Sequence, residues 1–270
     1  MAAPEPNATV AQKMEVAPGL MIMRVVPKNW ELSAFKPGQF VVIGLPGSAE
    51  RYFYSEAEVE PPAPEKLIKR AYSIASSSKE NQYVEFYISL VRSGALTPRL
   101  FNLNIGDELW MAPKITGMFT MDQIDEDKNI ILFATGTGVA PYMSMLRTNS
   151  LNHEKRNYAV VQGAYTSKDL GYRSELETIE RFCPNFTYIP TISHPENEPL
   201  AWNGQTGFVQ KVWEDRLLHE KWNTELTPDN TRIFLCGHPL MIDDMIELLG
   251  KKGFTEHTRK NPGSIHLERF

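Results

Sequence analysis

The segment Arg70-Ala71-Tyr72-Ser73 combines side chains that could hold a flat, phosphate-bearing cofactor. An arginine guanidinium can bind a pyrophosphate through two parallel hydrogen bonds. Tyr72 follows Arg70 by two residues, so in a strand the two side chains share one face, where a tyrosine ring can lie against a planar ring system. Ser73 adds a hydroxyl that can bond a ring nitrogen. An exposed arginine beside a half-buried tyrosine would also explain this motif, so alone it does not define a site.

A second segment, residues 94–100, predicts the start of a helix. Thr97 suits the N-cap position and Pro98 the first helical position. The N-terminus of a helix can bind phosphate, and Gly94 would let the backbone approach a ligand closely. A capped helix without a ligand has the same pattern.

Two glycine-containing segments follow apolar runs that read as buried strands. Thr135-Gly136-Thr137-Gly138 precedes a helical pattern, as nucleotide-binding loops do, although Pro141 stands where the G-x-G-x-x-G fingerprint has its third glycine. Cys236-Gly237-His238-Pro239 ends another apolar run and also opens a helical pattern. Both segments are therefore expected at the same edge of one sheet, where a nucleotide can bind.

The elements that must position these segments form two groups. The first contains short runs rich in β-branched and aromatic residues, separated by turn signals. They predict strands over residues 20–26, 39–45, 70–75, 83–91 and 108–112, which is typical of a small barrel or sandwich. In the second, apolar strands alternate with helical patterns, which is typical of a parallel sheet covered on both faces. Its strands are predicted over 129–135, 157–163 and 232–236. Its helices are predicted over 141–151, 174–182 and 239–252, and Gly253 is expected to end the last of them.

We therefore expect a β-barrel domain over residues 1–122, followed by a doubly wound α/β nucleotide-binding domain over residues 123–270. The 270 residues suffice for two domains of ordinary size. No apolar run approaches the roughly 20 residues of a membrane span, and the first 16 residues lack the pattern of a secretory signal. The chain has two cysteines, Cys183 and Cys236, which argues against an iron–sulfur centre or a disulfide framework and favours the cytoplasm. The net charge of −5 gives no support to nucleic-acid binding.

Taken together, these segments resemble the bacterial ferredoxin/flavodoxin–NADP reductases in order and spacing, from about residue 16 to residue 270. The matching segments are Arg70-Ala-Tyr-Ser73, Glu85-Phe-Tyr87, Gly94-x-Leu-Thr97-Pro-Arg-Leu100, Gly117-x-Phe119, Ala134-Thr-Gly-Thr137, Pro141-Tyr142, Cys236-Gly-x-Pro239 and the tail with Asn261-Pro-Gly263 and Glu268. Each motif is weak alone, and the ordered set is specific.

The resemblance implies an FAD-dependent enzyme that exchanges electrons between NADP(H) or NAD(H) and ferredoxin or flavodoxin, with hydride transfer at flavin N5. It implies catalytic roles for Ser73, for Cys236 near the point of hydride transfer, and for the terminal Phe270 as a gate over the flavin. It implies no metal. The implied FAD site consists of Arg70, Ala71, Tyr72, Ser73, Phe86, Tyr87, Ile88, Gly94, Ala95, Leu96 and Thr97, with Phe270 over the flavin. The implied nicotinamide nucleotide site consists of Gly136, Thr137, Gly138, Val139, Pro141, Tyr165, Arg173, Cys236, Gly237 and Pro239.

The chain departs from this family where arginines commonly bind the 2′-phosphate of NADP. Tyr165, His194 and Phe208 stand at those positions. A phosphate dianion without cationic partners is bound far less tightly than one held by charge-assisted hydrogen bonds. Arg173 or Arg181 could substitute, and Tyr165 could stack on adenine, so both NADPH and NADH stay open as the coenzyme.

Residues 48–69 form an acidic, proline-containing insertion, interpreted as a solvated loop rather than a contact to the adenine end of FAD or to a partner. An acidic carrier would need a basic face. The nearest clusters are Lys251, Lys252, Arg259 and Lys260, and Arg92 and Arg99, which are expected beside the flavin. A monomer is the default expectation. The alternatives are a flavin or oxygenase reductase of the same fold, a non-catalytic flavin-binding redox sensor and a purely structural protein.

Overall fold

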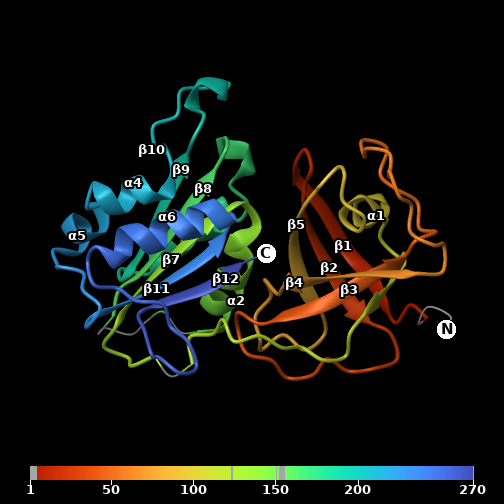
Figure 1. The fold of residues 1–270 in the computed structure, drawn as a ribbon, viewed down its shortest axis with the longest axis horizontal. Coiled ribbons are helices and arrows are strands. Elements are labelled where there is room, and N and C mark those ends of the chain that lie inside the picture. Colours follow the sequence, from red (N-terminus) through yellow and green to blue (C-terminus); the bar gives the residue numbers. More distant parts are fainter. Residues whose placement is uncertain (1–4, 123, 150, 152–155, 270) are drawn as a thin grey trace. The chain divides into compact units, whose positions relative to one another are not determined.

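The computed structural model describes residues 5–122, 124–149, 151 and 156–269, and the chain divides into two compact units (Figure 1). The first unit comprises Met1–Thr120 together with Met143–Thr148. The second comprises Met121–Tyr142 and Asn149–Phe270.

The first unit is built on a six-stranded sheet in the order β4-β3-β6-β1-β2-β5, with antiparallel pairing throughout. Its elements are β1 (Ala8–Ala17), β2 (Leu20–Pro27), β3 (Phe40–Pro46), β4 (Leu67–Ser73), β5 (Val84–Ser89), α1 (Thr97–Asn102) and β6 (Glu108–Met111). The two edge strands approach each other just beyond β4, where the N–H of Ala75 donates to the carbonyl of Glu85 at 2.8 Å. The sheet thus curls into a barrel around a core that includes Met21, Met23, Phe86, Leu100 and Phe101.

The second unit holds a parallel sheet in the order β10-β9-β8-β7-β11-β12. Its strands are β7 (Asn129–Thr135), β8 (Tyr158–Ala164), β9 (Phe186–Ile192), β10 (Gln205–Thr206), β11 (Thr231–Gly237) and β12 (Ile265–Arg269). Its helices are α2 (Ala140–Thr148), α3 (Arg173–Phe182), α4 (Val209–Glu214), α5 (Leu217–Trp222) and α6 (Pro239–Gly250), of which α2 continues into the first unit. Strand order reverses beside β7, because β8 and β9 extend the sheet to one side and β11 and β12 to the other.

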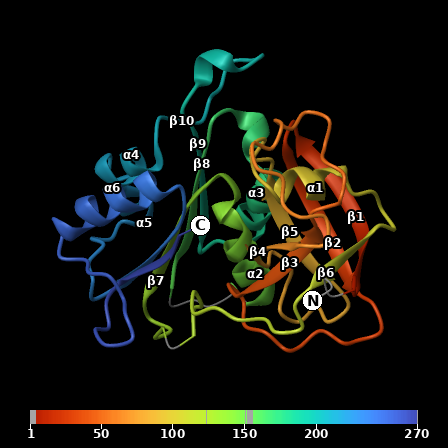
Figure 2. The ribbon, with the colours of Figure 1, turned by 45° about the vertical axis from the view of Figure 1, so that its right-hand side comes forward.

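Helices cover both faces of this parallel sheet. Ile131, Phe133 and Ile233 point into a core shared with residues of α4, α5 and α6, and the alternate residues of the same strands are buried on the opposite face. Figure 2 shows α2 and α3 on the other side of the sheet from these three helices. Burial on both faces explains why the strand sequences read as continuous apolar runs.

The expected fold class, a barrel followed by a doubly wound α/β domain, is confirmed. The strand predicted from residue 70 begins at Leu67, so residues 67–69 belong to β4 rather than to the insertion, and the helix predicted over 141–151 ends at Thr148. Six strands and helices were not predicted: β1, β9, β12, α4, α5 and the two-residue strand β10. Within the described ranges, no helix is both long and apolar enough to span a membrane.

Candidate active site

The edge strand β4 presents the Arg70–Ser73 motif. Arg70 and Ala71 are exposed, whereas Tyr72 and Ser73 are half-buried. The Tyr72 ring meets Phe86 of β5 edge-on, with 6.0 Å between ring centroids, and burial raises the pKa of its hydroxyl well above the ordinary value. Tyr72 therefore stays neutral, with its ring held between the two edge strands. The edge strand thus combines an exposed guanidinium, a fixed aromatic ring and a hydroxyl. This combination fits a flavin nucleotide, which has phosphates, a flat ring system and polar ring atoms.

The expected FAD residues of β5 are placed differently from those of β4. Phe86, Tyr87 and Ile88 are all buried, with exposed fractions of 0%, 3% and 1%. Phe86 and Ile88 pack into the core of the first unit, so a ligand along this edge would meet the β5 backbone rather than these two side chains. Tyr87 lies on the other face of the strand. The sequence motif correctly locates a strand here, but the side chains of Phe86 and Ile88 serve the core.

The turn before α1 corrects one expectation. Thr97 is not an N-cap, because its hydroxyl exchanges hydrogen bonds with the backbone of Val91, at 3.0 Å from the N–H and 3.2 Å to the carbonyl. Leu96 takes the N-cap position, without a side-chain cap, and Ala95 precedes it. Gly94 closes the same turn with an N–H to the Val91 carbonyl at 2.8 Å, and a Cβ there would lie 3.0 Å from that oxygen. The hydrogen bonds of Thr97 and Gly94 therefore stabilise this turn.

Arg99, one of the cations expected to form a basic docking face, is buried. Its side chain is 3% exposed and binds both carboxylate oxygens of Glu58, at 2.7 and 3.0 Å. Glu58 belongs to the insertion and also accepts from Arg51 at 2.9 Å. The hydrogen bond from Arg99 is the main cause that lowers the pKa of Glu58, so the carboxylate stays ionised. The insertion is therefore anchored by a buried ion pair and is not a merely solvated loop, and Arg99 cannot contribute to a docking face.

In the second unit, the loops after β7 and β11 approach each other closely. A Cβ at Gly138 would lie 2.1 Å from the carbonyl oxygen of Cys236, and one at Gly237 would lie 2.2 Å from Oγ1 of Thr135. The N–H of His238 donates to that same Thr135 oxygen at 2.9 Å. The glycines are required because any side chain would push these loops apart. The crevice where strand order reverses is the usual ligand site of an open parallel sheet.

The other nucleotide-site candidates in these loops differ in exposure. Gly136, at a φ of +54°, is exposed with open space at its Cβ position, and Thr137 is half-buried. Val139 and Pro141 are buried, whereas Pro239 is exposed at the start of α6. A ligand at this edge would thus meet Gly136, Thr137 and Pro239, while Val139 and Pro141 seat the helix that follows.

Cys236 is fully buried at the end of β11, and its thiol donates to the Glu268 carboxylate at 3.9 Å. Burial raises the pKa of this thiol well above its ordinary value, and the negative charge of Glu268 raises it further. Cys236 is therefore a neutral thiol. Phe270, the expected gate, lies outside the described residues.

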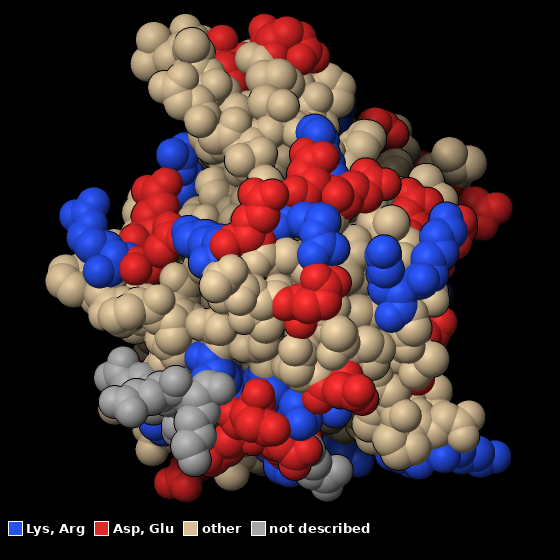
Figure 3. Space-filling view, turned by 90° about the vertical axis from the view of Figure 1, so that its left-hand side faces the viewer, with Lys and Arg blue, Asp and Glu red and all other residues tan. Residues whose placement is uncertain are grey.

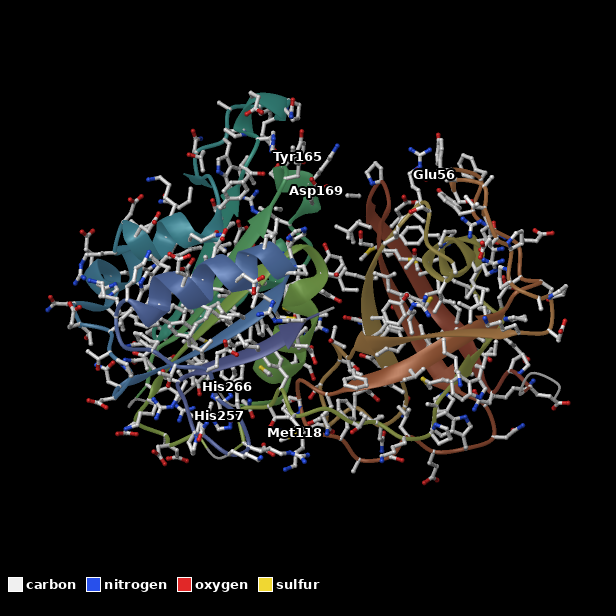
Figure 4. The ribbon with its side chains drawn as sticks, in the orientation of Figure 1. Glu56, Met118, Tyr165, Asp169, His257 and His266 are labelled. Carbon is white, nitrogen blue, oxygen red and sulfur yellow. The ribbon has the colours of Figure 1, made fainter. Side chains whose placement is uncertain are left out.

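A further group of residues gathers where β8 and β9 end (Figure 4). Tyr165 follows β8 and stacks on His194, which follows β9, with 3.8 Å between ring centroids. Arg173 begins α3, pairs with Glu177 at 2.6 Å, and lies over the ring of Trp202 at 4.9 Å. Arg181 occupies the last turn of α3, at the far end of that helix from these residues.

Two carboxylates in this region were not predicted. Asp169 and Glu198 each bind a backbone N–H and a hydroxyl at the end of β8. The T-x-x-D spacing of Thr166 and Asp169 is a capping-box signal that the sequence does display. Glu198 lies 31 residues from its partner Ser167, and no local pattern reveals that pairing.

Comparison with known proteins agrees with both units. Residues 7–114 match the model of an oxidoreductase FAD-binding domain and residues 132–247 that of an oxidoreductase NAD-binding domain. The chain is 30% identical over 247 residues to a ferredoxin–NADP reductase of Pseudomonas aeruginosa, covering 87% of this chain and 86% of that protein. It is 33% identical over 202 residues to the phenol hydroxylase P5 protein of Acinetobacter pittii, covering 74% of this chain and 53% of that one.

The fold is shared with solved structures as well. A ferredoxin NADP+ reductase from Neisseria gonorrhoeae, solved with bound FAD and NADP, superposes with a TM-score of 0.80 at 20% identity, covering 97% of each chain. The two domain matches and the extended likeness to the Pseudomonas protein agree with the paired barrel and parallel sheet. The chain belongs to the ferredoxin–NADP reductase family of oxidoreductases, with an FAD-binding domain followed by an NAD-binding domain.

Proposed function

We propose that this oxidoreductase passes electrons between a nicotinamide nucleotide and a one-electron carrier, ferredoxin or flavodoxin, through FAD held by the first unit. The observation that supports this most directly is the edge strand β4, which carries an exposed Arg70 and a fixed Tyr72 ring on one face, followed by Ser73 at its end. When bound, the flavin supplies the exchange between a hydride and single electrons.

The residues of the chain would bind and orient the two nucleotides. Arg70 would hold the pyrophosphate of FAD, Tyr72 would lie against the flavin ring, and Ser73 would hydrogen-bond the ring edge. The backbone of β5 and of the Gly94–Thr97 turn would complete that site. In the second unit, Gly136, Thr137 and Gly237 would form the floor of the nicotinamide nucleotide site, and holding reactants in place lowers much of the barrier to transfer. Cys236 would act as a neutral packing group there, since its thiol is buried.

The decisive experiment is anaerobic mixing of the purified protein with NADH and NADPH in turn, while the visible absorbance of its flavin is recorded. Rapid loss of absorbance with either nucleotide is expected. A colourless protein, or a bound flavin that neither nucleotide reduces, would overturn the proposal. Re-oxidation by added ferredoxin or flavodoxin then tests the acceptor.

The assignment of Arg70 has a matched control in its neighbour. Lys69 is an exposed cation one residue earlier, on the opposite face of β4, with its ammonium 5.5 Å from the centre of the Trp110 ring. We expect Arg70→Gln to weaken FAD binding about tenfold or more, and Lys69→Gln to change it less than about threefold, because only Arg70 would meet the pyrophosphate. Equal effects would remove Arg70 from the site.

A second candidate function is that of the reductase component of an oxygenase. The similarity to the phenol hydroxylase P5 protein favours it, although this chain covers only 53% of that protein. Rates of electron transfer to ferredoxin, flavodoxin and an isolated oxygenase component distinguish the two functions.

The proposed function also includes a basic surface that docks an acidic electron carrier. Figure 3 shows one face of the molecule, on which basic and acidic side chains are interspersed. Lys251 of the expected docking cluster is paired with Glu247 at 2.8 Å. Salt-dependent reduction of an acidic carrier would support a basic docking face. Both cysteines are unpaired, which supports a reducing cytoplasm, and we propose a monomer.

A further inference from the structure

The edge of the parallel sheet beyond β8 and β9 carries a flat aromatic surface. The Tyr165 and His194 rings are inclined by only 21° at a centroid separation of 3.8 Å. The hydroxyl of Tyr165 accepts a hydrogen bond from Asn197 at 3.2 Å, and its backbone carbonyl accepts one from the N–H of His194 at 3.0 Å, so both the ring and the backbone are held. Tyr165 is still 54% exposed. A rigid, exposed ring at this edge of a nucleotide-binding sheet suits a purine base.

Beside this surface, the backbone N–H and hydroxyl groups that could bind a phosphate already donate hydrogen bonds to carboxylates. Asp169 Oδ2 accepts from the N–H and hydroxyl of Thr166, at 3.0 and 2.6 Å. Glu198 accepts from the N–H and hydroxyl of Ser167, at 2.5 and 2.6 Å. The hydrogen bonds from Ser167 lower the pKa of Glu198, so that this carboxylate is ionised at neutral pH. A phosphate arriving here would meet like charges and would find these donors already satisfied.

Cations are scarce in the same segments. Residues 164–173 and 192–208, all within the described ranges, contain two of them, Lys168 and Arg173, against the three carboxylates Asp169, Glu196 and Glu198. Arg173 already pairs with Glu177 and stacks on Trp202. An imidazole lacks the two-pronged donor set of a guanidinium, so His194 is a weaker partner for a dianion than an arginine would be.

A pocket adjoins Glu198. It has a volume of roughly 470 Å³ and is lined by Ser167, Arg173, Glu198 and Trp202, among others. This volume is within the range of ligand-binding clefts. A carboxylate can accept hydrogen bonds from ribose hydroxyls, whereas it repels a phosphate in the same place. Glu198 still has acceptor capacity after its two bonds, because a carboxylate offers about four lone-pair sites.

We propose that this region selects the coenzyme, with Tyr165 and His194 receiving the adenosine and the Glu198 and Asp169 carboxylates rejecting a 2′-phosphate, so that the protein uses NADH in preference to NADPH. The inference rests on the proposed function, since it names the nicotinamide nucleotide that the second unit takes. Glu198 is its main specificity-determining residue.

Equilibrium binding tests the selection without any turnover. The FAD-loaded protein is titrated with AMP and with 2′,5′-ADP in a calorimeter. We expect AMP to bind at least about tenfold more tightly, as like-charge repulsion and unavailable donors both act against the extra phosphate. Tighter or equal binding of 2′,5′-ADP would overturn the proposal. Because neither ligand carries a nicotinamide, this result stands even if no nucleotide reduces the flavin.

Two variants locate the origin of the preference, with the ratio of flavin-reduction rates for NADPH and NADH as the readout. Glu198→Gln should raise that ratio about tenfold, whereas Glu196→Gln, which removes the same charge two residues away without touching Ser167, should raise it less than about threefold. His194→Arg adds a permanent cation beside Tyr165 and should also raise the ratio about tenfold. If Glu198→Gln disturbs folding, His194→Arg decides alone. An unchanged ratio in a folded His194→Arg protein, or a wild-type protein that prefers NADPH, would contradict the inference.

Discussion

His266 shows how a single residue can make stability depend on pH. Its ring stacks on Phe234 and on His257, with centroids at 4.6 and 4.5 Å (Figure 4). Burial, with smaller contributions from the neighbouring His257 and Arg232, lowers the pKa of His266 from 6.5 to about 4. Between pH 4 and pH 6.5 the unfolded chain binds more protons than the folded one. The contribution of His266 to the free energy of unfolding is therefore fully present above about pH 6.5 and is lost as the pH falls toward 4.

We therefore predict that His266→Phe makes stability less sensitive to acid. The free energy of unfolding, measured by urea titration at about pH 7.5 and pH 4.5, should fall by roughly 2 kcal/mol less in the variant than in the wild type. Phenylalanine keeps the flat contact with Phe234 and removes the titrating group. Identical losses in the two proteins would show that His266 takes no part in acid sensitivity.

Gly237 is a position where a single added methyl group should be strongly destabilising. Its φ is +141°, and a Cβ there would lie 2.2 Å from Thr135 Oγ1 and 2.9 Å from the Thr135 backbone. Gly237→Ala should cost about 1 to 3 kcal/mol in stability and weaken nucleotide binding, because the loops after β7 and β11 must separate. Gly250→Ala is the control, since this helical glycine has open space at its Cβ position and should be neutral or stabilising. Urea titration and coenzyme affinity give both readouts, and similar values for the two variants would argue against the close approach.

At the scale of elements, the insertion between β3 and β4 is tied down at Glu58. Arg99 is 3% exposed and would keep a buried, uncompensated charge if that carboxylate were neutralised. Glu58→Gln is expected to lower the free energy of unfolding by about 3 kcal/mol and to make residues 48–66 sensitive to limited proteolysis. Glu60→Gln, an exposed acid of the same insertion, should leave both unchanged. A stable, protease-resistant Glu58→Gln protein would show that other contacts hold the insertion.

Elements were predictable where the hydrophobic pattern was strong. β7, β8 and β11 are buried on both faces, so each contains an apolar run, at residues 130–134, 158–161 and 233–236. The helices α4 and α5 do show helical spacing, at Val209, Val212, Trp213, Leu217 and Leu218, and that signal could have been found. β1 has seven exposed or half-exposed residues out of ten, which weakens its alternation.

The candidate site was predictable only where one short segment carries it. The Arg70–Ser73 motif and the two glycine loops are each a single short segment. The structure places the motif on a strand and the loops at one edge of the parallel sheet, as predicted. Pairs such as Glu58 with Arg99 and Glu198 with Ser167 join residues 41 and 31 positions apart. Such pairings depend on how loops pack, which no local propensity encodes.

At the scale of the whole molecule, the chain does not divide at a single point. Met143–Thr148, the later part of α2, groups with the barrel although the rest of the helix groups with the parallel sheet. Within the first unit, Arg147 donates to the buried Glu85 carboxylate at 2.7 Å and to the carbonyl of Ala75 at 2.8 Å. We therefore propose a domain division near residues 122 and 123 in which the barrel also depends on this later segment.

The burial of Cys236 has a practical consequence for labelling chemistry. The chain has two cysteines: Cys236, whose raised pKa and full burial suppress thiolate formation, and Cys183, which is half-buried at the end of α3. Since thiol reagents attack the accessible thiolate, a maleimide should attach one label per folded molecule, at Cys183, and a second only after denaturation. Mass spectrometry of the labelled peptides checks this, and two labels in the folded state would show that β11 opens. The native sequence therefore supplies one attachment point for a fluorophore or spin label in the second unit.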